Sequence, residues 1–420
     1  METVRFHERQ SMSPTTTVAA PIAGSEARAR TAEQVDQWRE RLVALSHSIH
    51  AEPETAFAEY ASAEKLAVLM ESAGFAVERG VCDLPTALSA TYGTGDLTIG
   101  ICAEYDALPD IGHACGHNII CAAGAGAAIA LAAVADEHGF RVKLLGTPAE
   151  EAGGGKILML ERGAFDDVTL AMMVHPGPSI DLADPAYSSQ ANSRFEVTFH
   201  GRASHAAAAP AHGINAADAA TVAQVAIGLL RQQVADDHRI AGFVTEGGQR
   251  TNIIPERAAL AYEVRTPSAE EVAELRERVL NCFHGAALAT GTTMDVRPTA
   301  PDYADLRHDG WLMDTYRHNI TATGRTPLPQ PAGTKPKAST DMGNVTHALP
   351  AIHPIIGVLG ATGLPHTRDF AAETNTPAAD QAVIDGAKAM AWTGIDLALD
   401  LERRAAYVAR HAERSAASDN

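Results

Sequence analysis

Residues 103–118 read Ala-Glu-Tyr-Asp-Ala-Leu-Pro-Asp-Ile-Gly-His-Ala-Cys-Gly-His-Asn, and they follow an apolar run typical of a buried strand. The stretch places Cys115 and His117 two residues apart, in a loop just after this predicted strand. A thiolate and an imidazole at this spacing can bind one metal ion. The pair alone is weak evidence, because cysteine is often a small buried hydrophobic residue and a loop histidine is usually solvated.

Four further polar side chains follow other predicted strands. Glu150 and Glu151 come after the largely apolar residues 142–145, and His175 comes directly after residues 170–174. His366 lies far downstream, beyond a third apolar run. Because α/β sheets place their chemistry at the carboxyl ends of their strands, we expect these side chains to meet at one edge of a sheet.

The types of side chain indicate which metal ions fit. One soft, three borderline and one hard ligand are supplied by Cys115, His117, Glu151, His175 and His366. This mixture suits Zn²⁺ or Mn²⁺, with Co²⁺ or Ni²⁺ also compatible, and it suits Mg²⁺ and Ca²⁺ poorly. Five ligands exceed a closed tetrahedral site, so we expect two divalent metal ions per subunit.

The adjacent carboxylates of residues 150 and 151 can have different roles. Successive side chains of an extended segment face opposite sides, so Glu151 can bind metal while Glu150 acts as the general base. The alternative for a Glu-Glu pair in an acidic protein is a solvated turn. The three glycines at 153–155 lack the phosphate-loop pattern, which argues against a nucleotide site.

Length and charge limit the class of protein. A chain of 420 residues exceeds what one core usually supports, so two domains are expected. The net charge of −19 argues against nucleic acid or an anionic membrane as the partner and leaves a small-molecule substrate. Five cysteines without framework spacing favour reduced thiols and a cytoplasmic location.

The order of predicted elements indicates an α/β fold with an inserted domain. A loose tail is expected over 1–30 and a first helix from Thr31, where Thr31 and Gln34 can form a capping box. Strands and helices then alternate over 31–188, with a hairpin-like turn at 93–96 and a buried, Ala/Gly-rich helix at 119–135. The β-α pattern resumes over 303–420 and continues the same domain.

The pattern over 189–302 is different. Residues 194–200 alternate apolar and polar side chains, as in a half-exposed strand that could lie at a sheet edge. The segment continues as β-α-β-β-α-β, which resembles a small ferredoxin-like α+β module. We therefore expect a lid or dimerisation domain inserted into a larger catalytic domain.

Several ordered motifs carry a resemblance to a known family. They read His-Ala-Glu-Pro-Glu at 50–54, Glu-Tyr-Asp-Ala-Leu-Pro at 104–109, Gly-His-Ala-Cys-Gly-His-Asn at 112–118, Pro-Ala-Glu-Glu-Ala-Gly-Gly-Gly at 148–155, His-Pro at 175–176, Gly-Arg-Ala-Ser-His-Ala at 201–206, Thr-Asn-Ile-Ile-Pro at 251–255, Ser-Thr-Asp-Met-Gly-Asn-Val at 339–345 and His-Thr-Arg-Asp-Phe at 366–370. The chain resembles the aminoacylase/carboxypeptidase-like family of co-catalytic metal amidohydrolases over about residues 38–401. Within it, the chain resembles the branch of p-aminobenzoyl-glutamate hydrolase and β-alanyl-lysine-type dipeptidases.

The resemblance implies a role for each matching residue. The five ligands named above would bind two metal ions in a large α/β/α metallopeptidase-like domain, with Cys115 bridging them and Glu150 as the acid/base. Asp106 would orient a ligand imidazole, as an outer-shell carboxylate does. His205 would steady the developing oxyanion, and Asn252 and Arg265 would hold the substrate's amide or carboxylate. Asn118 departs from the aspartate that is usual in the wider family.

The implied function is hydrolysis of an amide bond by metal-activated water. The substrate would be a small N-acyl amino acid, an aryl-amide of glutamate or a dipeptide, and the sequence does not choose among them. A metal-binding or regulatory homologue without turnover and a thiol-dependent hydrolase that uses Cys115 are the alternatives. In the family the inserted module commonly pairs in a homodimer and lends its histidine, here His205, to the partner's site.

Overall fold

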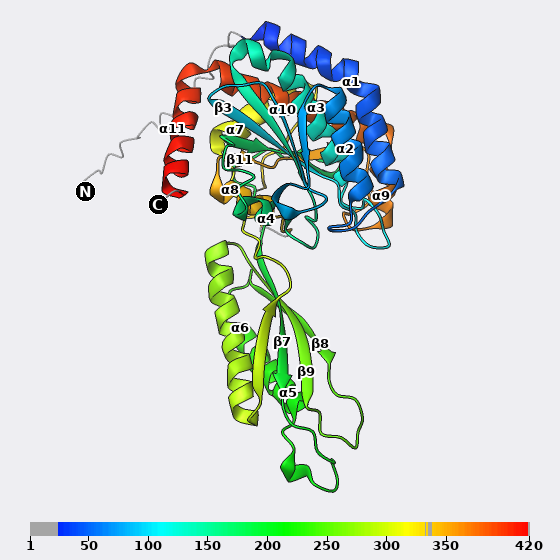
Figure 1. Ribbon diagram of the computed structural model, residues 1–420, viewed down its shortest axis with the longest axis vertical. Helices are drawn as coiled ribbons and strands as arrows, with labels where there is room; N and C mark the ends of the chain where they lie inside the picture. The colour runs from blue at the N-terminus through cyan, green and yellow to red at the C-terminus, as the bar shows by residue number, and fades with distance from the viewer. Residues whose placement is uncertain (1–23, 332, 335–337, 419–420) are drawn as a thin grey trace, which may run out of the picture.

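The structure has a large rounded body and a slender second body that projects from it (Figure 1). It is a computed structural model that describes residues 24–331, 333–334 and 338–418. Most of the predicted tail lies outside the described residues. The large body contains the first and last described helices, so the chain leaves it once and later returns.

A six-stranded mixed sheet forms the centre of the large body. Its order is β1-β2-β4-β3-β5-β11, with bounds Ala76–Arg79, Leu88–Tyr92, Phe140–Thr147, Leu97–Glu104, Leu170–Met172 and Ala351–Ile352 respectively. β3 is parallel to β4 and β5, and β5 is parallel to β11. β1 and β2 are joined to this parallel group by antiparallel pairing of β2 with β4. The predicted parallel β-α-β arrangement is therefore present.

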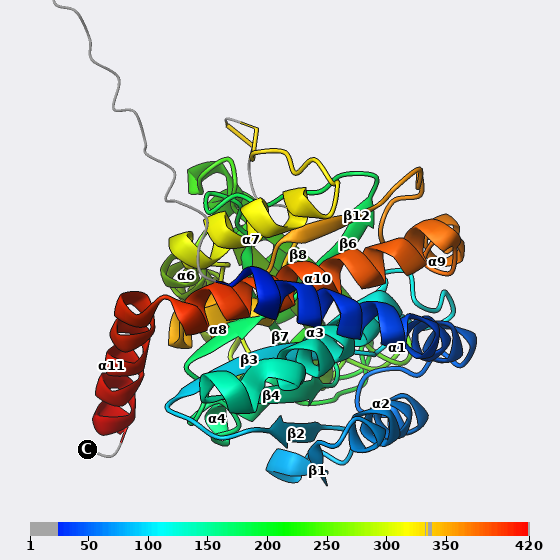
Figure 2. The same cartoon turned by 90° about the horizontal axis from the view of Figure 1, so that it is seen from above.

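Helices cover both faces of this sheet. α1 (Ser25–Ala51), α3 (His117–His138) and α10 (Pro377–Leu399) lie side by side over one face (Figure 2). Ile101 and Leu144 face this helical layer, whereas their neighbours Cys102 and Leu145 belong to a second apolar cluster on the other side. The remaining elements of the large body are α2 (Tyr60–Ser72), α4 (Gly155–Glu161), α7 (Gly310–Ala322), α8 (Met342–Ala348), α9 (Arg368–Glu373), α11 (Leu401–Ser418), β6 (His175–Pro178), β12 (Ile355–Val358) and the short helix Val81–Asp83. Two more short helices, Pro210–His212 and Arg231–Gln233, lie in the inserted module.

Small residues allow α3 to lie against its neighbours. A Cβ atom added at Gly126 would lie 2.8 Å from Ala387 of α10 and 2.9 Å from Leu42 of α1. Among the described helices, α3 is the one long and apolar enough to cross a membrane, but 94% of its most apolar window is buried inside the protein. The expected buried helix over 119–135 is confirmed.

Two local predictions were wrong. α1 begins at Ser25, and the hydroxyl of Thr31 donates to the carbonyl of Ala27 inside the helix instead of capping its start. The turn at 93–96 does not join a hairpin, because β4 lies between β2 and β3. Gly95 lies against the carbonyl oxygen of Gly139, where an added Cβ would be only 2.0 Å away, so the turn passes directly against the start of β4.

The slender body is the inserted module. Its sheet has the order β10-β7-β9-β8, with bounds Thr293–Pro298, Ala191–His200, Arg257–Thr266 and Arg239–Glu246, and every neighbouring pair is antiparallel. α5 (Ala216–Leu230) and α6 (Ala269–Thr290) pack on it and enclose a separate apolar core. The chain order β-α-β-β-α-β and this strand order are those of a ferredoxin-like module.

The strand predicted at residues 194–200 is not an edge strand. β7 pairs with β10 on one side and with β9 on the other, and the edges of the sheet are β10 and β8. Alternating side chains show that one face of a strand is buried, but they do not show how many neighbours it has. The chain enters and leaves this body at one point, where the main chains of Asn192 and Tyr303 exchange two hydrogen bonds of 2.9 Å. The domain boundaries at 188 and 302 stay a prediction.

Candidate metal centre

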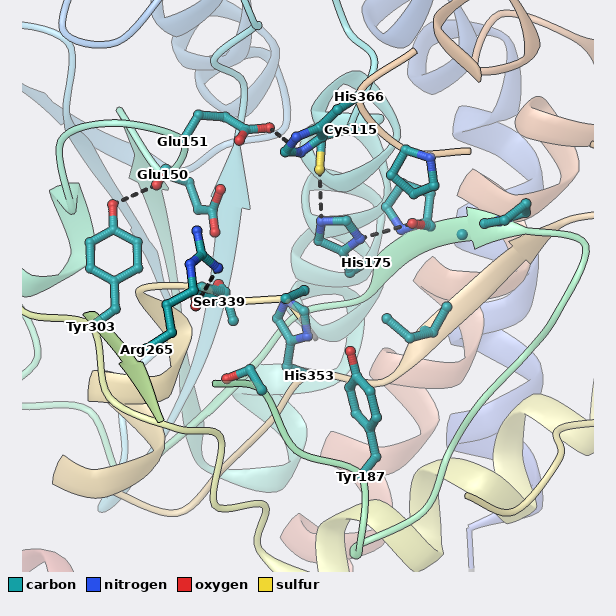
Figure 3. Close-up of a pocket in the computed structure, with 18 of the residues that line it drawn as sticks. Cys115, Glu150, Glu151, His175, Tyr187, Arg265, Tyr303, Ser339, His353 and His366 are labelled. Carbon is teal, nitrogen blue, oxygen red and sulfur yellow. Dashed lines mark hydrogen bonds and ion pairs between the residues drawn. The ribbon is translucent and has the colours of Figure 1, made fainter. Parts of the chain in front are cut away.

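Four of the five predicted ligands, Cys115, Glu151, His175 and His366, line one cavity of about 520 Å³ at the carboxyl ends of the parallel strands (Figure 3), and His117 lies next to Cys115 and His175. Cys115 lies in the loop between β3 and α3, and Glu151 follows β4. His175 begins β6, just beyond β5, and His366 lies just before α9. The position of the site at strand ends is the one that the sequence predicts.

The first group of possible ligand atoms comes from Cys115, His117 and His175. Their ligand atoms lie within 4.8 Å of one another, and the Sγ atom of Cys115 is 3.4 Å from Nε2 of His175. Nδ1 of His175 lies 2.8 Å from the carbonyl oxygen of Pro176, to which it can donate. That hydrogen bond fixes the tautomer and leaves the lone pair of Nε2 directed at the thiol.

The second group consists of Cys115, Glu151 and His366, again with ligand atoms within 4.8 Å. Nε2 of His366 is 3.5 Å from Oε1 of Glu151. His366 has a φ of 65°, a left-handed conformation that is unfavourable for a residue with a side chain. Its main-chain N–H donates to the carbonyl of Ala114, which joins this loop to the Cys-Gly-His loop.

These residues fit a pair of divalent cations. The two groups share Cys115, and together they offer sulfur, nitrogen and oxygen donors. Nε2 of His117 and Oε1 of Glu151 are buried without a hydrogen-bond partner among the described residues, a costly arrangement that a bound cation would relieve. Burial and the charge of Glu151 raise the pKa of the Cys115 thiol well above its usual range, so the sulfur needs a cation to remain a thiolate.

Asp106 contacts two members of this cluster. Its Oδ1 lies 2.9 Å from Nδ1 of His117, and its Oδ2 accepts a 3.0 Å hydrogen bond from the main-chain N–H of Glu151. The carboxylate is 1% exposed. Asp106 is therefore placed to orient both the imidazole of His117 and the segment that carries Glu151.

Glu150 lies beside the ligands in a buried group of acids. Its carboxylate is close to those of Glu104 and Asp341, with one oxygen from each within 4.8 Å of the others. Burial and the charge of Glu104 raise the pKa of Glu150 well above its usual range. Lys156 lies among them, with Nζ 2.6 Å from Asp341 and in contact with Glu104. Glu150 is thus in a position to exchange a proton with a molecule in the cavity.

Of the three lid residues that the sequence predicts for the site, His205, Asn252 and Arg265, only Arg265 lines the cavity. Its guanidinium donates to the hydroxyl of Ser339 at 3.3 Å and pairs with Glu263 at 3.0 Å. His205 and Asn252 are exposed: His205 follows the far end of β7, and Asn252 lies beside it in the loop between β8 and β9. At about 3.3 Å per residue, a strand as long as β7 separates the two ends by about 30 Å. The structure therefore does not bring His205 or Asn252 to the metal cluster of their own chain.

Sequence reasoning missed two buried residues of the cavity. Tyr303 donates from its hydroxyl to the carbonyl of Glu150 at 2.6 Å. His353 is 3% exposed, its ring centroid is 5.3 Å from that of His175, and neither ring nitrogen has a partner among the described residues. A histidine inside the apolar run 351–359 was a signal for the second residue. The loop around Tyr303 carried no signal of that kind.

Comparison with known proteins identifies the family. The sequence profile of peptidase family M20/M25/M40 matches residues 100–391. The chain belongs to this family. Among M20 relatives, it is 38% identical over 385 residues to the Xaa-Arg dipeptidase of Mus musculus, covering 88% of each chain. It is 34% identical over 285 residues to a component of the p-aminobenzoyl-glutamate hydrolase of Escherichia coli, covering 63% of this chain and 59% of that one.

A solved M20 structure has the same fold. The YXEP protein of Bacillus subtilis, described as a dinuclear metal binding peptidase, superposes with a TM-score of 0.62 at 20% identity and covers 86% of this chain and 98% of that one. The predicted resemblance and the α/β fold class are confirmed. As a member of the M20 family, the protein is a hydrolase that acts on amide or peptide bonds.

Proposed function

We propose that the protein is a metal-dependent amidohydrolase that cleaves the amide bond of a dipeptide, an N-acyl amino acid or an aryl-amide of glutamate. The observation that carries this proposal is the pair of ligand groups that share Cys115 next to the buried carboxylate of Glu150. Relatives named for dipeptide and p-aminobenzoyl-glutamate hydrolysis support the substrate class. Zn²⁺ or Mn²⁺ are the ions that these ligands favour, with Co²⁺ or Ni²⁺ compatible.

Two cations would be held by Cys115, His117, Glu151, His175 and His366. When bound, they would polarise the scissile carbonyl and lower the pKa of the attacking water. Glu150 accepts a proton from that water and then donates it to the nitrogen of the leaving amine, so the carboxylate is regenerated. Asp106 keeps the imidazole of His117 in the tautomer whose Nε2 faces the cluster.

Arg265 would select substrates with a free carboxylate. Its guanidinium faces the same cavity as Glu150, and Arg194 from β7 also lines this wall. A guanidinium can bind a carboxylate with two parallel hydrogen bonds. Dipeptides and N-acyl amino acids both present such a group next to the scissile amide, which is why both remain in the proposed class.

Substitution of the base tests the mechanism. Glu150→Gln keeps the size of the side chain but cannot accept a proton, so kcat should fall by about 10²–10⁴ while bound metal is retained. Metal analysis and kinetics on p-aminobenzoyl-glutamate, β-alanyl dipeptides and N-acyl amino acids are measured on one preparation. Activity within about threefold of wild type would remove Glu150 from the mechanism. A trapped acyl-thioester at Cys115 would instead support the thiol-dependent alternative.

We also propose a cytoplasmic homodimer in which each lid reaches the site of the other subunit. His205 and Asn252 lie too far from their own cluster to act there, so a partner would have to supply them. The edge strand β8 and helix α5 offer exposed apolar side chains for this contact, including Phe243, Val225 and Leu229. All five cysteines are free thiols, which agrees with a reducing compartment.

A further inference from the structure

The segment that carries the two catalytic carboxylates is held in an unfavourable conformation. Ala149 has a φ of 60°, in the left-handed region that residues with a Cβ atom rarely adopt. It directly precedes Glu150 and Glu151 and follows the end of β4. Conformations of this kind persist only where the surrounding structure fixes them, and they concentrate at functional sites.

Three buried side chains each fix one main-chain group in three consecutive residues of this segment. The N–H of Ala149 donates to Glu59 at 2.9 Å, the carbonyl of Glu150 accepts from Tyr303 at 2.6 Å, and the N–H of Glu151 donates to Asp106 at 3.0 Å. Glu59 precedes α2, Asp106 follows β3, and Tyr303 lies where the chain returns from the lid. The segment is therefore fixed from three separate parts of the fold.

Tyr303 is the member of this set that joins the lid to the catalytic base. Its main chain exchanges two hydrogen bonds with Asn192, at the point where the chain enters the lid, and its ring lies 5.6 Å from the guanidinium of Arg194. Its hydroxyl reaches across to the peptide of Glu150 (Figure 3). The side chain is 2% exposed, so water does not compete for this hydrogen bond.

We propose that Tyr303 is a positioning residue that orients the carboxylate of Glu150 through the main-chain carbonyl. The inference rests on the proposed function. Rotation of this peptide would turn the Glu150 side chain, and the oxygen of a general base must lie within about 3.2 Å of the heavy atom whose proton it accepts. A displacement of about 1 Å can reduce the rate of a catalysed step by about a hundredfold.

Tyr303→Phe removes the hydroxyl and leaves the ring in place. We expect kcat to fall about tenfold, since a lost hydrogen bond of typical strength corresponds to a factor of this order. KM should change less than about twofold and the metal content should stay at the wild-type value, because Asp106 still holds the N–H of Glu151 and Arg265 is not altered. Tyr316→Phe is the control for removal of a buried tyrosine hydroxyl as such, since that hydroxyl lies on α7, outside the cavity, and has no hydrogen-bond partner among the described residues. It should leave kcat unchanged.

A second substitution separates positioning from a general loss of structure. Glycine adopts a positive φ without strain, so Ala149→Gly should remove the tendency of the segment to relax when the Tyr303 hydroxyl is absent. The kcat of the double variant should therefore be at least threefold higher than the kcat of Tyr303→Phe. Hydrogen exchange of the peptide that contains residues 149–151 should rise in Tyr303→Phe, remain unchanged in Tyr316→Phe, and fall again in the double variant.

The outcomes are distinct. A Tyr303→Phe enzyme with kcat within twofold of an active wild type overturns the inference, and so does a loss of activity that follows loss of metal. Lack of recovery in the double variant also contradicts it. If the wild type hydrolyses no amide, the proposed function fails and the catalytic part of the inference fails with it. The exchange measurement still decides whether Tyr303 holds this segment.

Discussion

Replacing Lys156 should destabilise the catalytic domain strongly. Its side chain is fully buried between the equally buried carboxylates of Glu104 and Asp341. Nζ lies 2.6 Å from Asp341, and the main-chain N–H of the lysine donates to the same carboxylate at 2.9 Å. Lys156→Met keeps most of the volume and the apolar stem but removes the one cation of this group, leaving Glu150 as a third acid close by.

The magnitude follows from the burial of the charges. Removing one partner of a buried ion pair costs about 3–5 kcal/mol, because the other charge stays buried without compensation. This is a large part of the roughly 5–15 kcal/mol that stabilises a typical folded domain. Burial raises the pKa of Asp341 to about 6, and loss of the lysine raises it further. The cost should therefore shrink as the pH falls toward about 6, because the carboxyl group of the variant takes up a proton above that pH.

Urea unfolding followed by tryptophan fluorescence measures this effect selectively. All three tryptophans, at positions 38, 311 and 392, lie outside the lid and report on the catalytic domain. Lys388→Met is the matched control, since its ion pair with the half-exposed Asp36 is 2.8 Å long and should contribute less than about 1 kcal/mol. A Lys156→Met variant whose free energy of unfolding falls by less than about 1 kcal/mol at pH 7.5, or falls equally at pH 5 and pH 8, would refute the reasoning.

Three further predictions concern the metal, the partner subunit and pH. Cys115→Ala should lower metal content and abolish activity while the fold survives, and unchanged stoichiometry by elemental analysis would contradict its assignment as a ligand. Homodimers of His205→Ala and of Glu150→Gln should each be nearly inactive. Mixing and re-equilibrating the two should restore about a quarter of wild-type activity, because about half the dimers then contain one intact site. If subunits demonstrably exchange and no activity returns, the proposal that His205 acts in the partner's site is contradicted. Burial and the charge of Asp106 raise the pKa of Glu59 to about 7. The free energy of unfolding should therefore fall by about 3 kcal/mol as the pH rises from below 4.5 to above 7. Glu59→Gln should abolish this pH dependence in urea unfolding measured across the range.

The sequence predicted the parts of the molecule that depend on local patterns. The five predicted ligands each follow a predicted strand or an apolar run, and parallel strands bring their carboxyl ends to one edge, so these side chains meet in the structure. The Ala/Gly-rich run at 119–135 predicted a buried helix because such residues leave room for neighbouring helices. The ferredoxin-like module over 189–302 was predictable because its order of strands and helices can be read from local sequence patterns.

Contacts between distant parts of the chain were not predictable in this way. The hydrogen bond of Tyr303 to Glu150 depends on where the chain returns from the lid, which no spacing in the sequence encodes. α1 begins earlier than the predicted start at Thr31, because a threonine hydroxyl can donate to a carbonyl of its own helix as readily as it can cap the helix. The remote position of His205 follows from the length and direction of β7, and the motif around His205 carries neither quantity.

The paired main chains of Asn192 and Tyr303 have a consequence for how such a protein can arise and be altered. Because the two crossings lie side by side, the ends of the inserted module are adjacent, and the surrounding α/β domain is continuous on either side of them. A module can be gained, lost or exchanged at such a junction without moving a strand of the host sheet. The residues proposed to bind the metal ions all belong to the host, whereas Arg265, which we propose binds the substrate's carboxylate, belongs to the module. On that proposal, an exchange here would alter substrate choice while leaving the hydrolytic centre in place.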